Sequence, residues 1–179
     1  MNPVALPFFP YHPAPVASGS VEPSSGPCVC CGQRRGYLYH ASMYTAQNPN
    51  GTVCPWCIAD GSAAQRFDAE FSDVSDLDGV EASTIEEVAR RTPGFIGWQQ
   101  ERWLQHCGDA AAFLGPAGAA ELAGLPEVTD QLRQEMRAWR WQDELIDRHL
   151  AALDRDGMPV AFLFRCRSCG AHLAYTDGT

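Results

Sequence analysis

The sequence predicts an α+β protein with a zinc-knuckle or treble-clef-like module, a mainly helical middle region and a C-terminal β-hairpin knuckle. Two observations support this class. Cysteine occurs in three C-x-x-C pairs, two early in the chain and one near its end, and such pairs are typical ligands of structural zinc. Between the second and third pairs, apolar residues recur at steps of three and four, which is the period of a helix.

The length and composition predict one compact domain with a short appendage. A chain of 179 residues, 45% hydrophobic and 20% charged, can bury a core and is too apolar to be disordered. We expect a proline-rich N-terminal arm over residues 1–27 and a single zinc-stabilised domain over residues 28–179. The domain divides into a zinc module, a helical region and a C-terminal knuckle hairpin, over residues 28–71, 72–157 and 158–179.

The arm is defined by its prolines. Residues 1–27 contain seven of them, and proline disfavours both helices and central strands. Aromatic residues alternate with the prolines, as in the sequence FFPYHP. We therefore expect an extended arm that packs onto the domain.

The first two cysteine pairs form the favoured metal site. Structural zinc takes four tetrahedral ligands, and two C-x-x-C turns supply four thiolates. The first pair is followed by Gly32, which can adopt the positive φ that closes a zinc knuckle. A knuckle, a hairpin and a second pair beside a helix would make a treble clef. The predicted zinc ligands are Cys28, Cys31, Cys54 and Cys57.

The third pair, Cys166 and Cys169, leaves the grouping open. It could instead join Cys28 and Cys31 as a zinc ribbon split by a long insertion. If the first grouping holds, the third pair needs further donors to bind a second zinc ion. The candidate donors are His172, Cys30, His40 and His12. The alternative is a degenerate knuckle with two reduced thiols, so we expect one zinc site and leave a second open.

The sequence Cys54-Pro-Trp-Cys57 also resembles a dithiol redox motif, which gives the alternative function: a dithiol redox or zinc-dependent enzyme. A redox site of that kind needs a strand before the helix, and only the tripeptide GTV precedes Cys54. The sequence has no G-x-S-x-G or H-E-x-x-H motif, and it has no lysine for a phosphate-binding loop. We therefore do not expect an enzyme.

Four helices are expected between the second and third cysteine pairs. Short ones are predicted over residues 62–71 and 83–91, the latter with the capping-box spacing of Ser83 and Glu86. A third is predicted over 98–114, where Cys107 falls on an apolar stripe and is interpreted as a core residue. The longest should begin at 127–130 and run towards residue 154. Two strands, 160–164 and 172–175, should follow as a hairpin.

Four tryptophans fall on or beside the two longer predicted helices, and we expect them to fill the core or line a groove for a partner. They are Trp98, Trp103, Trp139 and Trp141.

The charge of the chain excludes some partners. It has 13 basic residues, all arginine, against 22 acidic ones, for a net charge of -9. Binding of nucleic acid or anionic lipid depends on a basic surface, so neither is expected. Eight acids between residues 68 and 87 predict a solvated surface. The sequence shows no membrane segment and no signal peptide, so we expect a cytoplasmic protein without membrane insertion.

Several motifs together resemble the CbrC family of bacterial proteins. They are YHP at 11–13, CCG at 30–32, CPWCIADGSAA at 54–64, RTPGF at 91–95, GWQQE at 97–101 and CGAHLAY at 169–175. The resemblance covers about residues 6–177. It implies a zinc-stabilised bacterial protein associated with colicin tolerance under stress regulation, and it supplies no catalytic residue. The resulting hypothesis is a zinc-binding protein-interaction or regulatory module, which would use its acidic face or its tryptophans to bind a partner.

Overall fold

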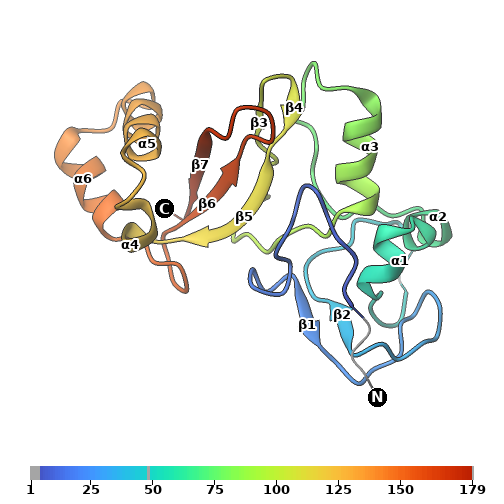
Figure 1. Cartoon of the computed structure of the whole chain (residues 1–179). Helices are drawn as coiled ribbons and strands as arrows, with labels where there is room; N and C mark the ends of the chain where they lie inside the picture. Colours follow the sequence, from blue (N-terminus) through green and yellow to red (C-terminus); the bar gives the residue numbers. More distant parts are fainter. Residues whose placement is uncertain (1–4, 48, 179) are drawn as a thin grey trace.

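The computed structural model describes residues 5–47 and 49–178 of the chain (Figure 1). Three small antiparallel sheets form within them. They are β1 (Val21–Pro23) with β2 (Tyr37–Tyr39), β3 (Gln105–His106) with β4 (Asp109–Ala110), and the meander β5 (Ala112–Ala117), β6 (Val160–Arg165) and β7 (His172–Asp177). The helices are α1 (Pro55–Ala59), α2 (Ser62–Phe67), α3 (Ala82–Arg91), α4 (Ala119–Leu122), α5 (Pro126–Ala138) and α6 (Asp143–Ala151). This content confirms the α+β class.

The meander separates two apolar cores because its side chains alternate between two faces. Along β6, Phe162 and Phe164 enter an aromatic core, whereas Ala161 and Leu163 face the opposite side. That second side packs against α4, α5 and α6 (Figure 1). A third core surrounds the first two cysteine pairs and includes α1 and α2.

The N-terminal arm packs onto the domain as expected. Phe9, Tyr11 and His12 are all buried, and the N–H of Phe113 donates to the carbonyl of Tyr11 at 2.7 Å. The end of the arm forms the short edge strand β1, with Pro23 as its last residue. An edge position is where a sheet tolerates proline.

Burial of His12 makes folding pH-dependent. Its Nδ1–H donates to the Pro93 carbonyl at 2.7 Å, and its Nε2 lies 2.7 Å from the Ser18 hydroxyl oxygen. Burial lowers the pKa of His12 to about 4. The unfolded chain therefore binds a proton that the folded chain does not, and the free energy of unfolding falls as the pH drops below the unfolded pKa.

We expect this contribution to lower stability by about 2 kcal/mol between about pH 7 and about pH 5. The measurement is urea denaturation of the wild type and of His12→Gln at both pH values. The two proteins share all other titratable groups, so the effects of those groups cancel when the change in the free energy of unfolding of His12→Gln is subtracted from that of the wild type. Parallel pH profiles for the two chains would contradict the assignment.

The helix expected over residues 98–114 is absent, and that prediction is wrong. The segment instead forms β3, β4 and the start of β5. Cys107 and Gly108 form a two-residue hairpin turn with φ values of 55° and 72°, which no α-helix accommodates. Cys107 is consequently exposed and is not a core residue.

The long helix expected to begin at 127–130 is divided in two. Helix α5 ends at Ala138, Arg140 adopts a left-handed φ of 64°, and α6 begins at Asp143. The apolar residues that recur at steps of three and four along this region are nevertheless buried in the core, except for Trp139, which is 53% exposed. The buried members are Leu132, Met136, Ile146, Leu150 and Leu153.

The remaining elements lie close to their predicted positions. Helix α2 ends before a left-handed Asp68. Helix α3 has Glu81 at its N-cap with no side-chain cap bond, so the capping box expected at Ser83 and Glu86 is not formed. Strands β6 and β7 confirm the C-terminal hairpin. No helix in the described part of the chain is long and apolar enough to cross a membrane.

Candidate metal centres

The first cluster, which we call centre 1, consists of Cys28, Cys31, Cys54 and Cys57. The first pair lies in a tight turn in which the N–H of Gly32 donates to the Cys28 carbonyl at 2.7 Å. Gly32 has a φ of 72°, as the knuckle requires. The second pair is placed by α1, because Cys54 is its N-cap residue and Cys57 lies in its first turn. The predicted quartet is thus brought together in one place.

The sulfur positions of centre 1 match a tetrahedral metal site. The Sγ atoms of Cys28 and Cys57 are 3.9 Å apart, as are those of Cys31 and Cys54. All four sulfurs lie within 4.8 Å of one another. Four thiolates at about 2.3 Å from a zinc ion would be separated by about 3.8 Å. The cluster therefore fits metal binding without rearrangement of the backbone.

The electrostatics of centre 1 favour a bound cation. Burial opposes ionisation of Cys28, but backbone N–H groups including that of Cys54 (3.1 Å from the sulfur) outweigh it and lower its pKa. Burial raises the pKa of Cys54 to about 11 and raises that of Cys57 further. Gathering four thiolates here is therefore costly unless a positive ion offsets their charge.

These features argue against a dithiol redox site at Cys54 and Cys57. A reactive cysteine in such a motif is accessible and has a lowered pKa. Cys54 is fully buried and its pKa is raised by burial. Its location at a helix N-terminus does not overcome that environment.

The second cluster, which we call centre 2, consists of His106, Cys107, Cys166 and Cys169. The first two residues lie at the β3–β4 turn, and the other two lie between β6 and β7. The Nδ1 atom of His106 is 3.2 Å from the sulfur of Cys107 and 3.3 Å from that of Cys169. All four ligand atoms lie within 4.8 Å of one another. One imidazole and three thiolates are a common donor set of structural zinc.

Centre 2 differs from both alternatives that the sequence left open for the third cysteine pair. The pair does not join Cys28 and Cys31, which belong to centre 1. None of the four candidate donors belongs to its cluster. His172 faces Glu127, His40 faces Glu22, and Cys30 lies 3.8 Å from Ser62. The ring of His12 is bonded to the Pro93 carbonyl and the Ser18 hydroxyl.

Sequence reasoning missed His106 and Cys107 because it assigned them to a helix, on which adjacent residues point in different directions. His106 instead ends β3 and Cys107 begins the hairpin turn, where the two side chains can face the same point. The glycine after Cys107 was the available signal, since glycine is typical of the second central position of such turns.

The treble-clef topology is not confirmed. Strand β2 lies between the two cysteine pairs of centre 1, as a treble-clef hairpin would. It pairs, however, with β1 from the arm, with Val21 opposite Tyr39. Backbone bonds from Val29 to Thr52 and from Tyr39 to Val53 then tie the two cysteine turns together.

The fold and the two clusters define a class of α+β protein with paired candidate metal centres. The family model that matches describes an uncharacterised protein family, UPF0167, over residues 6–178. Relatives in Mycobacterium bovis and Mycobacterium tuberculosis are each 54% identical over 178 residues, covering 98% of this chain and 95% of each relative. One in Pseudomonas aeruginosa is 47% identical over 173 residues, covering 95% of both chains. The chain belongs to the UPF0167 family. No solved structure matches it.

Proposed function

We propose that this protein is a zinc-stabilised module that binds a partner protein and is not an enzyme. The observation that carries the proposal is the donor set of centre 1, in which the sulfurs of four cysteines lie within 4.8 Å of one another. Four thiolates are enough to fill every position of a tetrahedral zinc site. A catalytic zinc site has three protein ligands and leaves a fourth position for water or substrate. The role proposed for centre 1 is therefore to stabilise the core that surrounds the first two cysteine pairs and includes α1 and α2.

Zinc is the metal that best suits centre 1. Thiolates select zinc, copper(I) or iron–sulfur clusters, and a tetrahedral four-sulfur arrangement favours zinc or iron. The sulfur separations of 3.9 Å leave room for a single ion. Eight cysteines with free thiols suit a reducing compartment, which supports the cytoplasmic location expected from the sequence.

The proposed partner surface surrounds Trp98. The side chain of this residue is 78% exposed, and Ile96 and Met158 beside it are 52% and 49% exposed. Together they border a hollow of about 290 Å³. The buried carboxylate of Asp177 accepts the backbone N–H groups of Trp98 at 2.6 Å and of Gln99 at 3.1 Å. Exposed tryptophan on a fixed backbone is typical of a binding hot spot.

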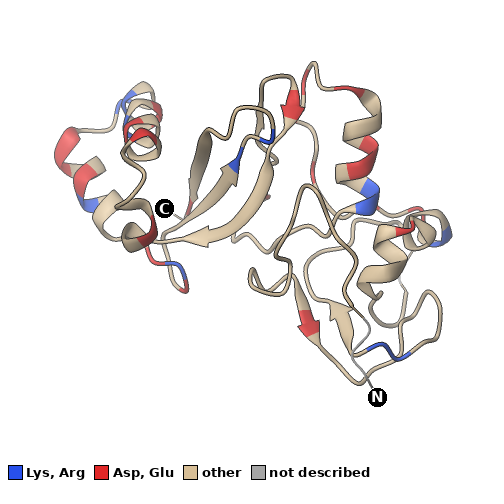
Figure 2. Cartoon of the chain, viewed as in Figure 1, with Lys and Arg blue, Asp and Glu red and all other residues tan. Residues whose placement is uncertain are grey.

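The charge of the chain indicates a basic partner. The net charge is -9, and acidic residues are spread over α3, α5 and α6 (Figure 2). Such a field attracts a basic protein and speeds its association. Trp98 would supply the apolar anchor of the interface, while the acidic residues would attract the basic partner as it approaches.

A photo-crosslinking experiment tests the partner surface. A photoreactive phenylalanine is placed at position 98 and, as a control, at Leu145, which is exposed on α6. We expect a basic protein to crosslink only through position 98. Once purified, it should bind the wild type with an affinity that falls with salt and is lost in Trp98→Ala. Identical products from both positions, or undiminished binding to Trp98→Ala, would contradict the proposal.

We expect no appreciable binding to duplex or single-stranded nucleic acid at physiological salt. The two arginines beside the first knuckle are engaged within the chain, since Arg34 donates to the Ser25 carbonyl and Arg35 stacks over Trp56. The acidic field repels a polyanion. Fluorescence anisotropy with generic duplex and single-stranded probes makes the check, and micromolar salt-sensitive binding would refute it.

The resemblance to CbrC adds a physiological expectation to the proposal. Loss of the protein should alter tolerance to colicin or to envelope stress if the module acts in that setting. Comparison of a deletion strain with a strain complemented by Trp98→Ala would connect the phenotype to the proposed surface.

A further inference from the structure

We propose that centre 2 is an exchangeable zinc site, which releases its metal before centre 1 and fixes the β3–β4 hairpin to the β6–β7 turn. The inference rests on the metal-binding role proposed above and not on the partner surface. Four observations support it: the exposure of its ligands, an adjoining groove, the backbone conformation of Cys107, and the contacts of the hairpin.

The two centres differ in exposure. In centre 1, three of the four cysteines are buried, and Cys31 alone is exposed. In centre 2, Cys107 and Cys169 are exposed, His106 is partly exposed, and only Cys166 is buried. A competing ligand must reach a metal ion in order to displace its donors. Centre 2 offers that approach, whereas centre 1 is shielded by its own core.

A groove borders centre 2 on the side of its β6–β7 turn. It has a volume of about 560 Å³, and both Cys166 and Cys169 contribute to its wall. Arg165 and Arg167 line the same groove. The Arg167 guanidinium pairs with Asp109, and no ion pair engages Arg165 within the described residues. The positive charge of Arg165 favours the approach of an anionic chelator or a thiolate, so the groove provides a route for removing the metal.

The backbone at Cys107 indicates that its side chain has a specific role. Cys107 and Gly108 occupy the two central positions of a β-hairpin turn, both with positive φ. This turn type strongly prefers Asn-Gly or Gly-Gly, because a side chain other than Asn or Asp is strained there. A cysteine occupies the strained position, with its sulfur 3.2 Å from His106 Nδ1. A metal–sulfur bond would offset the cost of that conformation.

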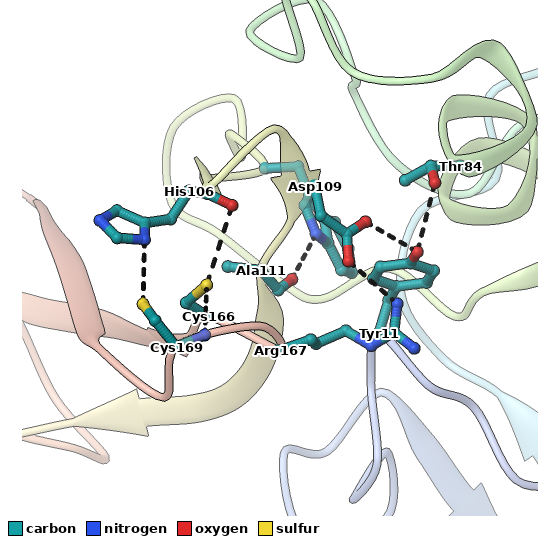
Figure 3. Close-up of polar contacts among 9 residues, drawn as sticks. Tyr11, Thr84, His106, Asp109, Ala111, Cys166, Arg167 and Cys169 are labelled. Atoms are coloured by element: carbon teal, nitrogen blue, oxygen red, sulfur yellow. Dashed lines mark hydrogen bonds and ion pairs between the residues drawn. The ribbon is translucent and has the colours of Figure 1, made fainter.

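The hairpin connects centre 2 to the arm and to α3 (Figure 3). Asp109, two residues beyond Cys107, accepts a hydrogen bond from the Tyr11 hydroxyl at 3.0 Å and pairs with Arg167 at 3.2 Å. The Arg167 guanidinium lies over the Tyr11 ring, 4.4 Å from its centre. The Tyr11 hydroxyl also lies 3.4 Å from the Thr84 hydroxyl oxygen on α3. Metal binding at centre 2 would therefore hold this group of contacts in place.

Zinc release to a coloured chelator tests the proposal, with protein reconstituted with zinc under reducing conditions. We expect the wild type to hold two equivalents and to release one quickly while the fold persists, and the second only on unfolding. Cys107→Asn should hold one equivalent and lack the fast phase. Asparagine suits the turn better than cysteine, so this variant should fold. Cys169→Ser provides a second route to the same loss.

Cys30→Ser is the matched control, because Cys30 is a buried cysteine outside both clusters. It should keep two equivalents and both phases. A wild type with one equivalent that Cys107→Asn leaves unchanged would overturn the proposal but not centre 1. Release of both ions in a single phase with unfolding would also overturn it. A chain that binds no zinc at all would overturn the proposed function as well.

Hydrogen exchange gives a second readout. Selective removal of the fast zinc should increase amide exchange in residues 105–110 and 9–13, and leave residues 54–60 unchanged. Unchanged exchange in the hairpin would show that centre 2 does not fix it.

Discussion

Replacing Cys54 with serine is expected to abolish the cooperative unfolding transition of this protein. Cys54 is fully buried, begins α1 and contributes one sulfur to centre 1. Structural zinc contributes about 10–16 kcal/mol of binding free energy, comparable with the entire net stability of a domain, about 5–15 kcal/mol. Losing one of four ligands removes much of that contribution and leaves three thiolates facing one another.

Circular dichroism during thermal denaturation makes the measurement, with zinc content determined on the same samples. Cys30→Ser is again the control, since its sulfur hydrogen-bonds to the Ser62 hydroxyl at 3.8 Å and belongs to neither cluster. The control should melt cooperatively and keep its zinc. A Cys54→Ser chain that melts within a few degrees of the wild type would show that centre 1 does not stabilise the fold.

Truncation of Trp103 to alanine should produce the second-largest loss, about 3–5 kcal/mol in the free energy of unfolding. Trp103 is fully buried in the aromatic core, with its ring centre 5.8 Å from those of Phe95 and Phe164. Its indole N–H donates to the Ala111 carbonyl at 2.9 Å. The variant therefore leaves a large cavity and an unsatisfied buried carbonyl.

Trp98→Ala provides a matched comparison within the same segment. The Trp98 side chain is 78% exposed, so its removal should change stability by less than about 0.5 kcal/mol. Urea denaturation of both variants gives the two values. Similar losses for the two tryptophans would contradict the packing described for this segment.

The sequence predicted the parts of the fold that depend on local chemistry. The quartet of centre 1 follows from C-x-x-C spacing and from the glycine that closes the first knuckle. The terminal hairpin follows from two apolar runs on either side of the third pair. The arm packs onto the domain as expected because burying its aromatic side chains removes apolar surface from water, which is favourable.

The sequence misled where helix and strand patterns overlap. Residues 98–114 place apolar side chains at helical steps, yet Cys107 and Gly108 turn the chain there, and the strands β4 and β5 follow. The local pattern could not show that packing against the aromatic core would favour strands over a helix in this segment. Centre 2 was missed for the same reason, because its ligands come together only when the β3–β4 hairpin meets the β6–β7 turn.

The break between α5 and α6 has a similar origin. The apolar stripe continues across Arg140, but the chain bends there so that both helices cover one face of the meander. The sequence pattern indicates which residues are apolar. It does not indicate where the face of the meander ends, and therefore where the helix must bend.

Anomalous scattering on either side of the zinc absorption edge, from crystals grown under reducing conditions, tests the central claim most directly. We expect a zinc peak among the sulfurs of Cys28, Cys31, Cys54 and Cys57, about 2.3 Å from each. An anomalous map with no zinc peak among these four sulfurs, or a disulfide between any two of them, would contradict the metal-stabilised module proposed here.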